Sequence, residues 1–243
     1  MRLLLISNST LHGSGYLDHC ALEITGFLGS VKSILFIPFA RPSGISHDEY
    51  AAKARERYAA MGIELTSIHE ETDMQKAVAE AESIFIGGGN SFLLASQLHN
   101  YSLIETIAGR VRGGMPYIGT SAGSNVACPT IMTTNDMPII EPKSFNALNL
   151  VPFQINPHYL DPDPDSTHKG ETRETRIREF LAFNDRKVAG LREGAMILAE
   201  GDTKLLKGTT GARIFERGKE PIEIAPGADV SFQIGRASCR ERV

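Results

Sequence analysis

Two hydrophobic patterns alternate along the first two-thirds of the chain. Short runs of Ile, Leu and Phe bounded by turn residues predict buried strands. These runs cover residues 2–7, 33–40, 63–69, 83–88 and 116–119. Helical patterns lie between them and cover residues 48–62, 73–82 and 102–114. Ser46 and Glu49 form a capping-box signature that predicts the start of the first of these helices. This alternation predicts an α/β fold with a mostly parallel sheet and helices on both faces.

The pattern changes after residue 185. Short strand-like runs separated by glycine and charged turns predict antiparallel hairpins, which we place at one edge of the sheet. They cover residues 187–193, 195–201, 203–208, 212–218 and 220–225. We see neither an internal repeat nor a linker, and therefore predict one α/β domain over residues 1–233. Residues 234–243 are rich in arginine and lack an apolar period, which predicts a non-native or disordered tail.

Composition and charge exclude several classes of protein. The 243 residues hold 25 Lys and Arg against 29 Asp and Glu, without the basic excess of a nucleic-acid binder. No apolar run is long enough to cross a membrane. The three cysteines show no paired spacing, which favours a reducing compartment and a cytoplasmic location. The histidines and cysteines lack metal-ligand spacing, so we expect no metal.

The segment 119–123 carries the main chemical signal. It reads G-T-S-A-G and follows a predicted strand, which is the setting of a nucleophile elbow. There the Ser121 hydroxyl is exposed at the end of the sheet, and the backbone N–H of Ala122 faces a developing oxyanion. This pattern predicts a nucleophilic serine. The alternative is a tight turn of small residues, or a phosphate-binding helix N-terminus.

A glycine-rich loop closes the preceding predicted strand. Residues 87–90 read G-G-G-N, and loops at the carboxyl ends of parallel strands gather where ligands bind. We therefore predict Gly89 as the second oxyanion donor. The alternative is a plain turn or a dinucleotide loop, but Phe92 stands where G-x-G-x-x-G requires its third glycine.

A nucleophilic serine needs a base and an orienting acid. His158 follows a strand-like run and lies among prolines, so it is the predicted base, with His168 as its main rival. Glu193 ends another predicted strand, and Asp136 lies in the loop TTNDMPI. The order Ser121, His158, Glu193 places these three residues at strand ends of one sheet, while Asp136 is the alternative acid.

Several long blocks of the sequence resemble peptidase E, the α-aspartyl dipeptidase of peptidase family S51. They are SNSTLHG, FIPFA, GGGN, GTSAGSNVACPTI, TTNDMPI, QINPHY and HKGETRETRIRE, and the likeness runs to about residue 233. The resemblance implies a serine peptidase that cleaves dipeptides with an N-terminal aspartate and needs no cofactor. It also implies a sheet like that of class I glutamine amidotransferases, of flavodoxin-like type. Leu160 replaces the acid of those enzymes, which disfavours glutaminase chemistry.

The resemblance also assigns roles to residues. It carries the nucleophile onto Ser121 and the base onto His158, and it leaves the acid open between Glu193 and Asp136. It places recognition of the substrate aspartate in the block HKGETRE. There we expect Arg173, and after it Arg176, to bind the carboxylate. The alternative is an exposed helix on which both arginines pair with Glu174 and Glu179.

The predicted function is therefore a serine-type dipeptidase acting on Asp-X dipeptides through an acyl-enzyme. One alternative is a cyanophycinase-like exopeptidase acting on β-aspartyl peptides. Another is a catalytically silent binding protein with the same fold. We expect a small peptide as the partner, without nucleic acid or membrane, and hold a homodimer open.

Overall fold

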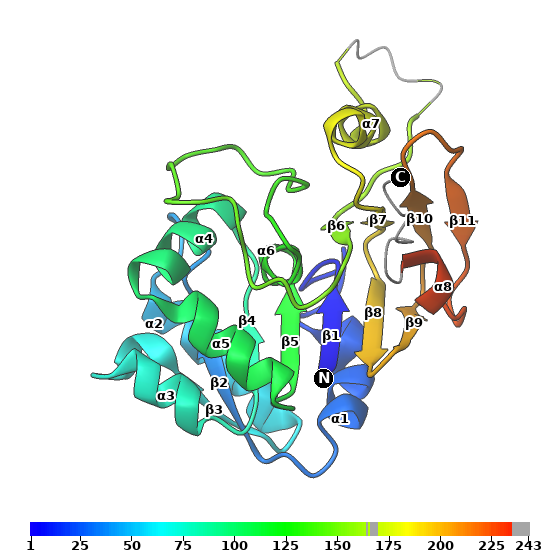
Figure 1. Cartoon of the computed structure of the whole chain (residues 1–243). Helices are drawn as coiled ribbons and strands as arrows, with labels where there is room; N and C mark the ends of the chain where they lie inside the picture. Colours follow the sequence, from blue (N-terminus) through cyan, green and yellow to red (C-terminus); the bar gives the residue numbers. More distant parts are fainter. Residues whose placement is uncertain (164, 166–169, 235–243) are drawn as a thin grey trace.

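The larger of two sheets is mostly parallel. A computed structural model of the chain describes residues 1–163, 165 and 170–234. Seven strands form the first sheet in the order β3-β2-β4-β5-β1-β8-β9. The strands from β3 to β1 run parallel, and β8 and β9 extend the sheet antiparallel beyond β1 (Figure 1). Their bounds are β1 Arg2–Ile6, β2 Ser33–Ile37, β3 Glu64–Ser67, β4 Ile84–Ile86, β5 Tyr117–Thr120, β8 Ala195–Glu200 and β9 Thr203–Gly208.

Helices cover both faces of this sheet because its strands alternate their apolar side chains between two cores. On β1, Leu4 and Ile6 pack in one core with α1 and α2, whereas Leu3 and Leu5 pack in the other with α3, α4 and α5. This arrangement confirms the predicted fold class. The helix bounds are η1 Asp18–Cys20, α1 Ala21–Leu28, α2 His47–Ala60, η2 Ile68–Glu70, α3 Met74–Glu80, α4 Ser91–Asn100, α5 Leu103–Arg112, α6 Ala122–Val126, α7 Arg173–Phe183 and α8 Ser231–Ile234.

A second, four-stranded sheet corrects the predicted placement of the C-terminal strands. Its order is β11-β10-β7-β6, with β6 parallel to β7 and the other pairs antiparallel. Its bounds are β6 Gln154–Asn156, β7 Val188–Leu191, β10 Ala212–Phe215 and β11 Ile222–Ile224. Only the β8–β9 hairpin joins the edge of the first sheet. The pairing of β7 with β6, more than 30 residues earlier, is a long-range contact that local patterns do not encode.

Local sequence signals located the starts of the predicted helices, but they did not reveal every helix. The Ser46 side chain accepts from the Glu49 N–H, and the Glu49 carboxylate accepts from the Ser46 N–H, so the capping box is formed. The helices α1 and α4 were not predicted. Asn90 caps α4 by accepting from the Leu93 N–H, directly after the glycine-rich loop. Cap residues therefore mark several of these helix ends even where the apolar period is weak.

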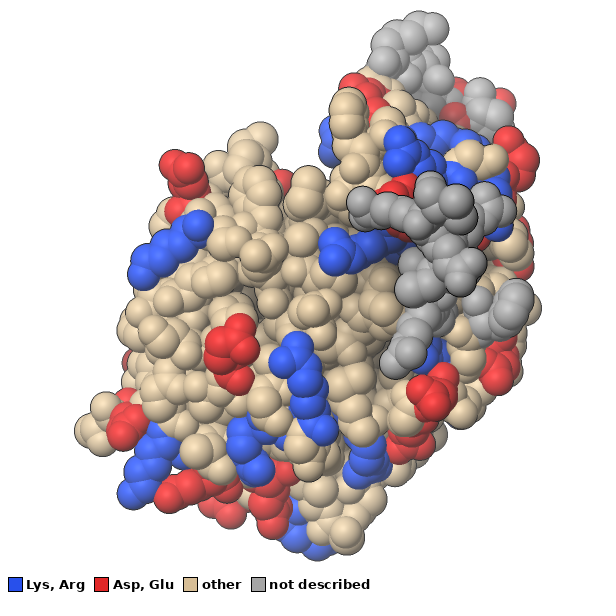
Figure 2. All heavy atoms as spheres, viewed as in Figure 1, with Lys and Arg blue, Asp and Glu red and all other residues tan. Residues whose placement is uncertain are grey.

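Two further expectations concern the ends and the surface. Ile234 closes α8 and is buried, while the rest of the predicted tail, residues 235–243, lies outside the described residues. None of the helices in the described part of the chain has the length and apolarity needed to cross a bilayer. On the face seen in Figure 2, basic and acidic side chains are interspersed among neutral ones.

Candidate active site

Ser121 lies in the turn between β5 and α6 with a strained backbone. Its φ is 52° and its ψ is −110°, a region that residues with a side chain rarely adopt. The flanking glycines make this turn possible. A Cβ atom on Gly119 would lie 2.5 Å from the Gly123 carbonyl oxygen, and one on Gly123 would lie 2.1 Å from the Ile86 carbonyl oxygen. Close backbone packing therefore requires both glycines of G-T-S-A-G.

The Ser121 hydroxyl meets an imidazole and a carboxylate. Ser121 Oγ lies 3.0 Å from His158 Nε2, and His158 Nδ1 lies 2.7 Å from Glu193 Oε1. The side chains of His158 and Glu193 are 40% and 46% exposed, so water reaches both. These contacts match the geometry of a nucleophile, a base and an orienting acid. The rival His168 lies outside the described residues.

These three residues come from two sheets, not from one as predicted. Ser121 follows β5 of the first sheet, His158 follows β6 of the second sheet, and Glu193 lies in the turn from β7 to β8. Figure 1 shows β6 and β7 beyond the carboxyl ends of β1 and β5. The turn at Glu193 carries the chain from the second sheet back to the first, and so brings the acid to the serine.

Ser7 and Asn8 connect the two sheets at this point. The Ser7 hydroxyl accepts from the His158 N–H at 2.9 Å and donates to the Leu191 carbonyl at 2.8 Å. The Asn8 side chain accepts from the Gly194 N–H at 2.8 Å. Both side chains are buried, so these bonds are shielded from water. Their positioning role was missed in the sequence analysis. Both residues directly follow β1, and the carboxyl ends of parallel strands are where ligand-binding residues gather, which is also why Gly89 and Ser121 were predicted.

The glycine loop lies against the serine. A Cβ on Gly88 would lie 3.1 Å from Ser121 Cβ, and one on Gly89 would lie 2.2 Å from the Ala40 carbonyl oxygen. Tyr50 Oη donates to the Gly88 carbonyl and holds this loop from the side of α2. Within the described chain, the N–H groups of Gly89 and Ala122 donate no backbone hydrogen bond. Both predicted donors are thus available for a ligand oxygen.

Asp136 lies near the serine but does not hold His158. Its carboxylate accepts from the Ser91 N–H at 2.7 Å and from Thr134 Oγ1 at 2.8 Å. The first bond fixes the loop to the start of α4. The neighbouring Asn135 side chain donates to the Pro157 carbonyl, directly before His158. Asp136 therefore shapes the wall of the site, and Glu193 occupies the position beside the histidine.

A cavity of about 350 Å³ opens over the serine. It is lined by Ser121, Thr134, Asn135, Asp136, Pro157, His158, Leu160, Arg173 and Glu193. Arg173 contributes the cation of this lining, from the first turn of α7. Burial, and then the charge of Arg176, lower the pKa of the Arg173 guanidinium, while Asp136 raises it. An anion in the cavity would relieve that burial cost.

Arg176 does not line the cavity and pairs with Glu171 at 3.6 Å. The alternative pairing of the arginines with Glu174 and Glu179 is also not found in the described residues. Glu174 instead pairs with Arg178 and Arg213, which anchors α7 to the second sheet. These ion pairs hold α7 in place, and the Arg173 side chain in its first turn lines the cavity.

A separate cluster contains the kinds of side chain that bind metals. The ligand atoms of Asp48, His69 and Glu70 lie within 4.8 Å of one another. His69 bonds to Ser67 and Asp48, and Glu70 bonds to the Arg55 guanidinium, so these groups already have partners. None of them lines the cavity over Ser121. Nothing in this cluster connects a metal to the candidate chemistry, and the absence of a metal stays a prediction.

Comparison with known proteins identifies the family. A family model described as peptidase family S51 matches residues 3–207. The chain belongs to peptidase family S51. It is 54% identical over 231 residues to a peptidase E of Streptomyces coelicolor, covering 95% of this chain and 94% of that protein. It is 45% identical over 233 residues to a probable alpha-aspartyl dipeptidase of Drosophila melanogaster, covering 95% and 96%.

Solved structures agree with the S51 fold. A peptidase from an acI-B1 Actinobacterium superposes with a TM-score of 0.70 at 19% identity, covering 95% of this chain and 96% of that one. A putative peptidase E protein from Listeria monocytogenes superposes with a TM-score of 0.63 at 21% identity, covering 92% and 98%. At these identities the likeness supports the fold alone.

The packing of the elbow glycines leads to a stability prediction. Gly123→Ala should destabilise this S51 chain by several kcal/mol, because its methyl group would overlap the Ile86 carbonyl oxygen. Gly109→Ala is the matched control, since a Cβ there meets nothing within 4 Å and α5 gains a better helix former. Urea denaturation measures both. Equal stability of the two variants would contradict the packing argument.

Proposed function

We propose that this chain is a serine-type dipeptidase that hydrolyses Asp-X dipeptides through an acyl-enzyme. The observation that carries the proposal is the contact from Ser121 Oγ through His158 to Glu193, beside two unpaired backbone amides. Membership in a peptidase family supports hydrolysis of peptide bonds. The names of the two relatives, peptidase E and probable alpha-aspartyl dipeptidase, support the choice of aspartyl substrates.

The proposed reaction follows from the arrangement of donors and acceptors. The Glu193 carboxylate accepts a hydrogen bond from the Nδ1–H of His158, which leaves Nε2 unprotonated and able to take the proton of the Ser121 hydroxyl. The serine oxygen then attacks the peptide carbonyl, and the amides of Gly89 and Ala122 stabilise the oxyanion. The C–N bond breaks as His158 returns the proton to the leaving amine. Water, activated by the same histidine, hydrolyses the ester.

Substrate selection in this proposal rests on Arg173. A free aspartyl residue brings a side-chain carboxylate into the cavity, where Arg173 supplies a guanidinium at its wall. Charge-assisted bonds of this kind are roughly twice as strong as neutral ones. Asp136 and Glu193 line the same cavity, and their negative charge complements the free α-ammonium group of a dipeptide. A homodimer and a cytoplasmic location stay predictions.

A dipeptide panel tests the proposed function. We expect Asp-Leu to be cleaved with a kcat/KM at least about tenfold above those of Asn-Leu, Glu-Leu and Leu-Leu, because only the aspartyl carboxylate reaches Arg173. Ser121→Ala should lower kcat by about 10⁴-fold or more. The comparison uses β-Asp-Arg as a further substrate. Faster cleavage of that compound, or activity retained by Ser121→Ala, would overturn the proposal.

The two arginines of α7 form a matched pair for substrate binding. Arg173→Ala should lower kcat/KM for Asp-Leu by about 100-fold, a loss of roughly 3 kcal/mol from a charge-assisted contact. Arg176→Ala should change it by less than about threefold, because that side chain pairs with Glu171 at the surface. Steady-state kinetics on Asp-Leu measures both. If Arg176→Ala lowers kcat/KM more than Arg173→Ala does, then Arg176 and not Arg173 binds the substrate carboxylate.

The two candidate acids are separable by isosteric changes. Glu193→Gln removes the charge beside His158 Nδ1 and should lower kcat by about 100-fold or more. Asp136→Asn keeps an acceptor for the Ser91 N–H and should change kcat by less than about tenfold, with the larger effect on KM. If kcat falls further in Asp136→Asn than in Glu193→Gln, the orienting role belongs to Asp136.

A further inference from the structure

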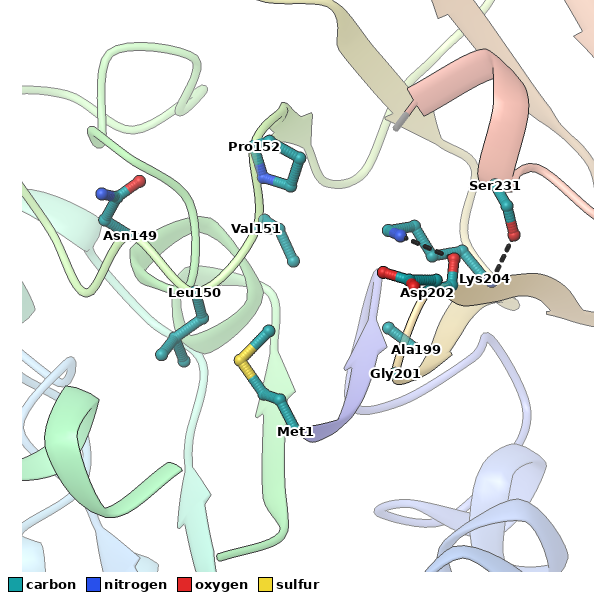
Figure 3. Close-up of a pocket in the computed structure, with 10 residues that line it drawn as sticks. All are labelled: Met1, Asn149, Leu150, Val151, Pro152, Ala199, Gly201, Asp202, Lys204 and Ser231. Carbon is teal, nitrogen blue, oxygen red and sulfur yellow. Dashed lines mark hydrogen bonds between the residues drawn. The ribbon is translucent and has the colours of Figure 1, made fainter. Parts of the chain in front are cut away.

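A second hollow lies at the opposite end of β1 from Ser121. It measures about 480 Å³ and lies between the loop 149–152 and the turn from β8 to β9 (Figure 3). Met1 stands at the amino end of β1, whereas Ser7 follows the carboxyl end beside His158. A five-residue strand is about 17 Å long, so the two sites are separate. The catalytic proposal makes no use of this hollow.

A largely buried lysine lines this hollow. The Lys204 residue is only 9% exposed, and its Nζ donates to the Asp202 carbonyl at 3.0 Å. Lys204 forms no ion pair among the described residues, so two of its three N–H groups lack a protein acceptor there. Figure 3 shows the ammonium directed toward Val151 and Pro152. Burial of a charge is costly unless it is paired, which favours an anionic ligand at this point.

Two hydrogen bonds fix the backbone of Lys204 against the segment that leads into α8. Its N–H donates to Ser231 Oγ at 2.7 Å, and its carbonyl accepts from the Val230 N–H at 2.8 Å. The Asp229 carboxylate in turn accepts from the Ser231 N–H at 2.8 Å. These hydrogen bonds between β9 and the segment leading into α8 therefore fix the position of the Lys204 backbone. Such a preorganised donor loses little freedom when a ligand binds.

The rest of the lining defines the ligand. The exposed Asp202 also lines the hollow, and Leu150, Val151 and Met1 supply an apolar wall (Figure 3). The Lys204 ammonium, the Asp202 carboxylate and this aliphatic surface complement a molecule with a carboxylate, an ammonium and an alkyl side chain. We propose that this hollow binds a free aliphatic α-amino acid, with its carboxylate on Lys204 and its ammonium on Asp202.

Calorimetric titration of the full chain with L-leucine tests this site. We expect saturable one-to-one binding at millimolar concentrations or below, as suits a ligand with few heavy atoms. 4-Methylpentanoate is leucine without the amine and isoamylamine is leucine without the carboxylate, so each should bind at least about tenfold more weakly than leucine. Absence of saturable leucine binding, or equal affinity for 4-methylpentanoate, overturns the proposal.

Variants locate the binding. Lys204→Met should weaken leucine binding by at least about tenfold. Lys207→Met on the same strand is the matched control, because its side chain lines a hollow on the other face and should leave affinity unchanged. Asp202→Asn changes an exposed side chain and keeps the carbonyl that Lys204 uses, so it provides a second measurement if Lys204→Met folds poorly.

The candidate active site is the competing location for leucine. Arg173→Ala alters that cavity and should leave the calorimetric affinity for leucine unchanged. If Arg173→Ala abolishes binding while Lys204→Met retains it, leucine occupies the cavity over Ser121 and the second site is refuted. Because the readout is binding, it stays informative whether or not the chain cleaves Asp-X dipeptides.

Discussion

The Ser7 hydroxyl joins the two halves of the candidate site. It accepts from the His158 N–H and donates to the Leu191 carbonyl, so one side chain at the end of β1 binds the loop after β6 and the last residue of β7. Asn8 adds a bond to the Gly194 N–H in the turn after Glu193. Without such bonds, a histidine and an acid of the second sheet would not hold a fixed distance to a serine of the first sheet.

Backbone strain is concentrated at the same place. Ser121 and His158 both have φ near 52°, a conformation that costs a residue with a side chain of order 1–3 kcal/mol. The surrounding structure offsets this cost through buried bonds. The Ser124 hydroxyl donates to the Ile6 and Gly119 carbonyls, and the Asn125 side chain donates to the Ile155 carbonyl. The helix after the nucleophile is thus tied to β1, β5 and β6.

Charge in the two hollows is arranged differently. Over Ser121, a partly buried guanidinium faces two carboxylates in a cavity that water enters, which suits a charged substrate that must leave again. At the other end of β1, a buried ammonium has one carbonyl partner and an apolar wall. Elsewhere the cations of the second sheet are neutralised. Arg192 lies between Asp161 and Glu223, and its hydrogen bond lowers the pKa of Asp161.

The sequence by itself determined the strands of the parallel sheet, the capping box at Ser46 and the small-residue turn around Ser121, because these depend on residues close along the chain. It also marked His158 and Glu193 as residues at strand ends, and Asp136 as the alternative acid in a loop. Only the tertiary structure decided that Glu193, and not Asp136, contacts the histidine, and that Ser7 and Asn8 hold both loops. Those contacts join residues more than 30 positions apart across two sheets, and strand pairing at such separation leaves no periodic signal in the local sequence.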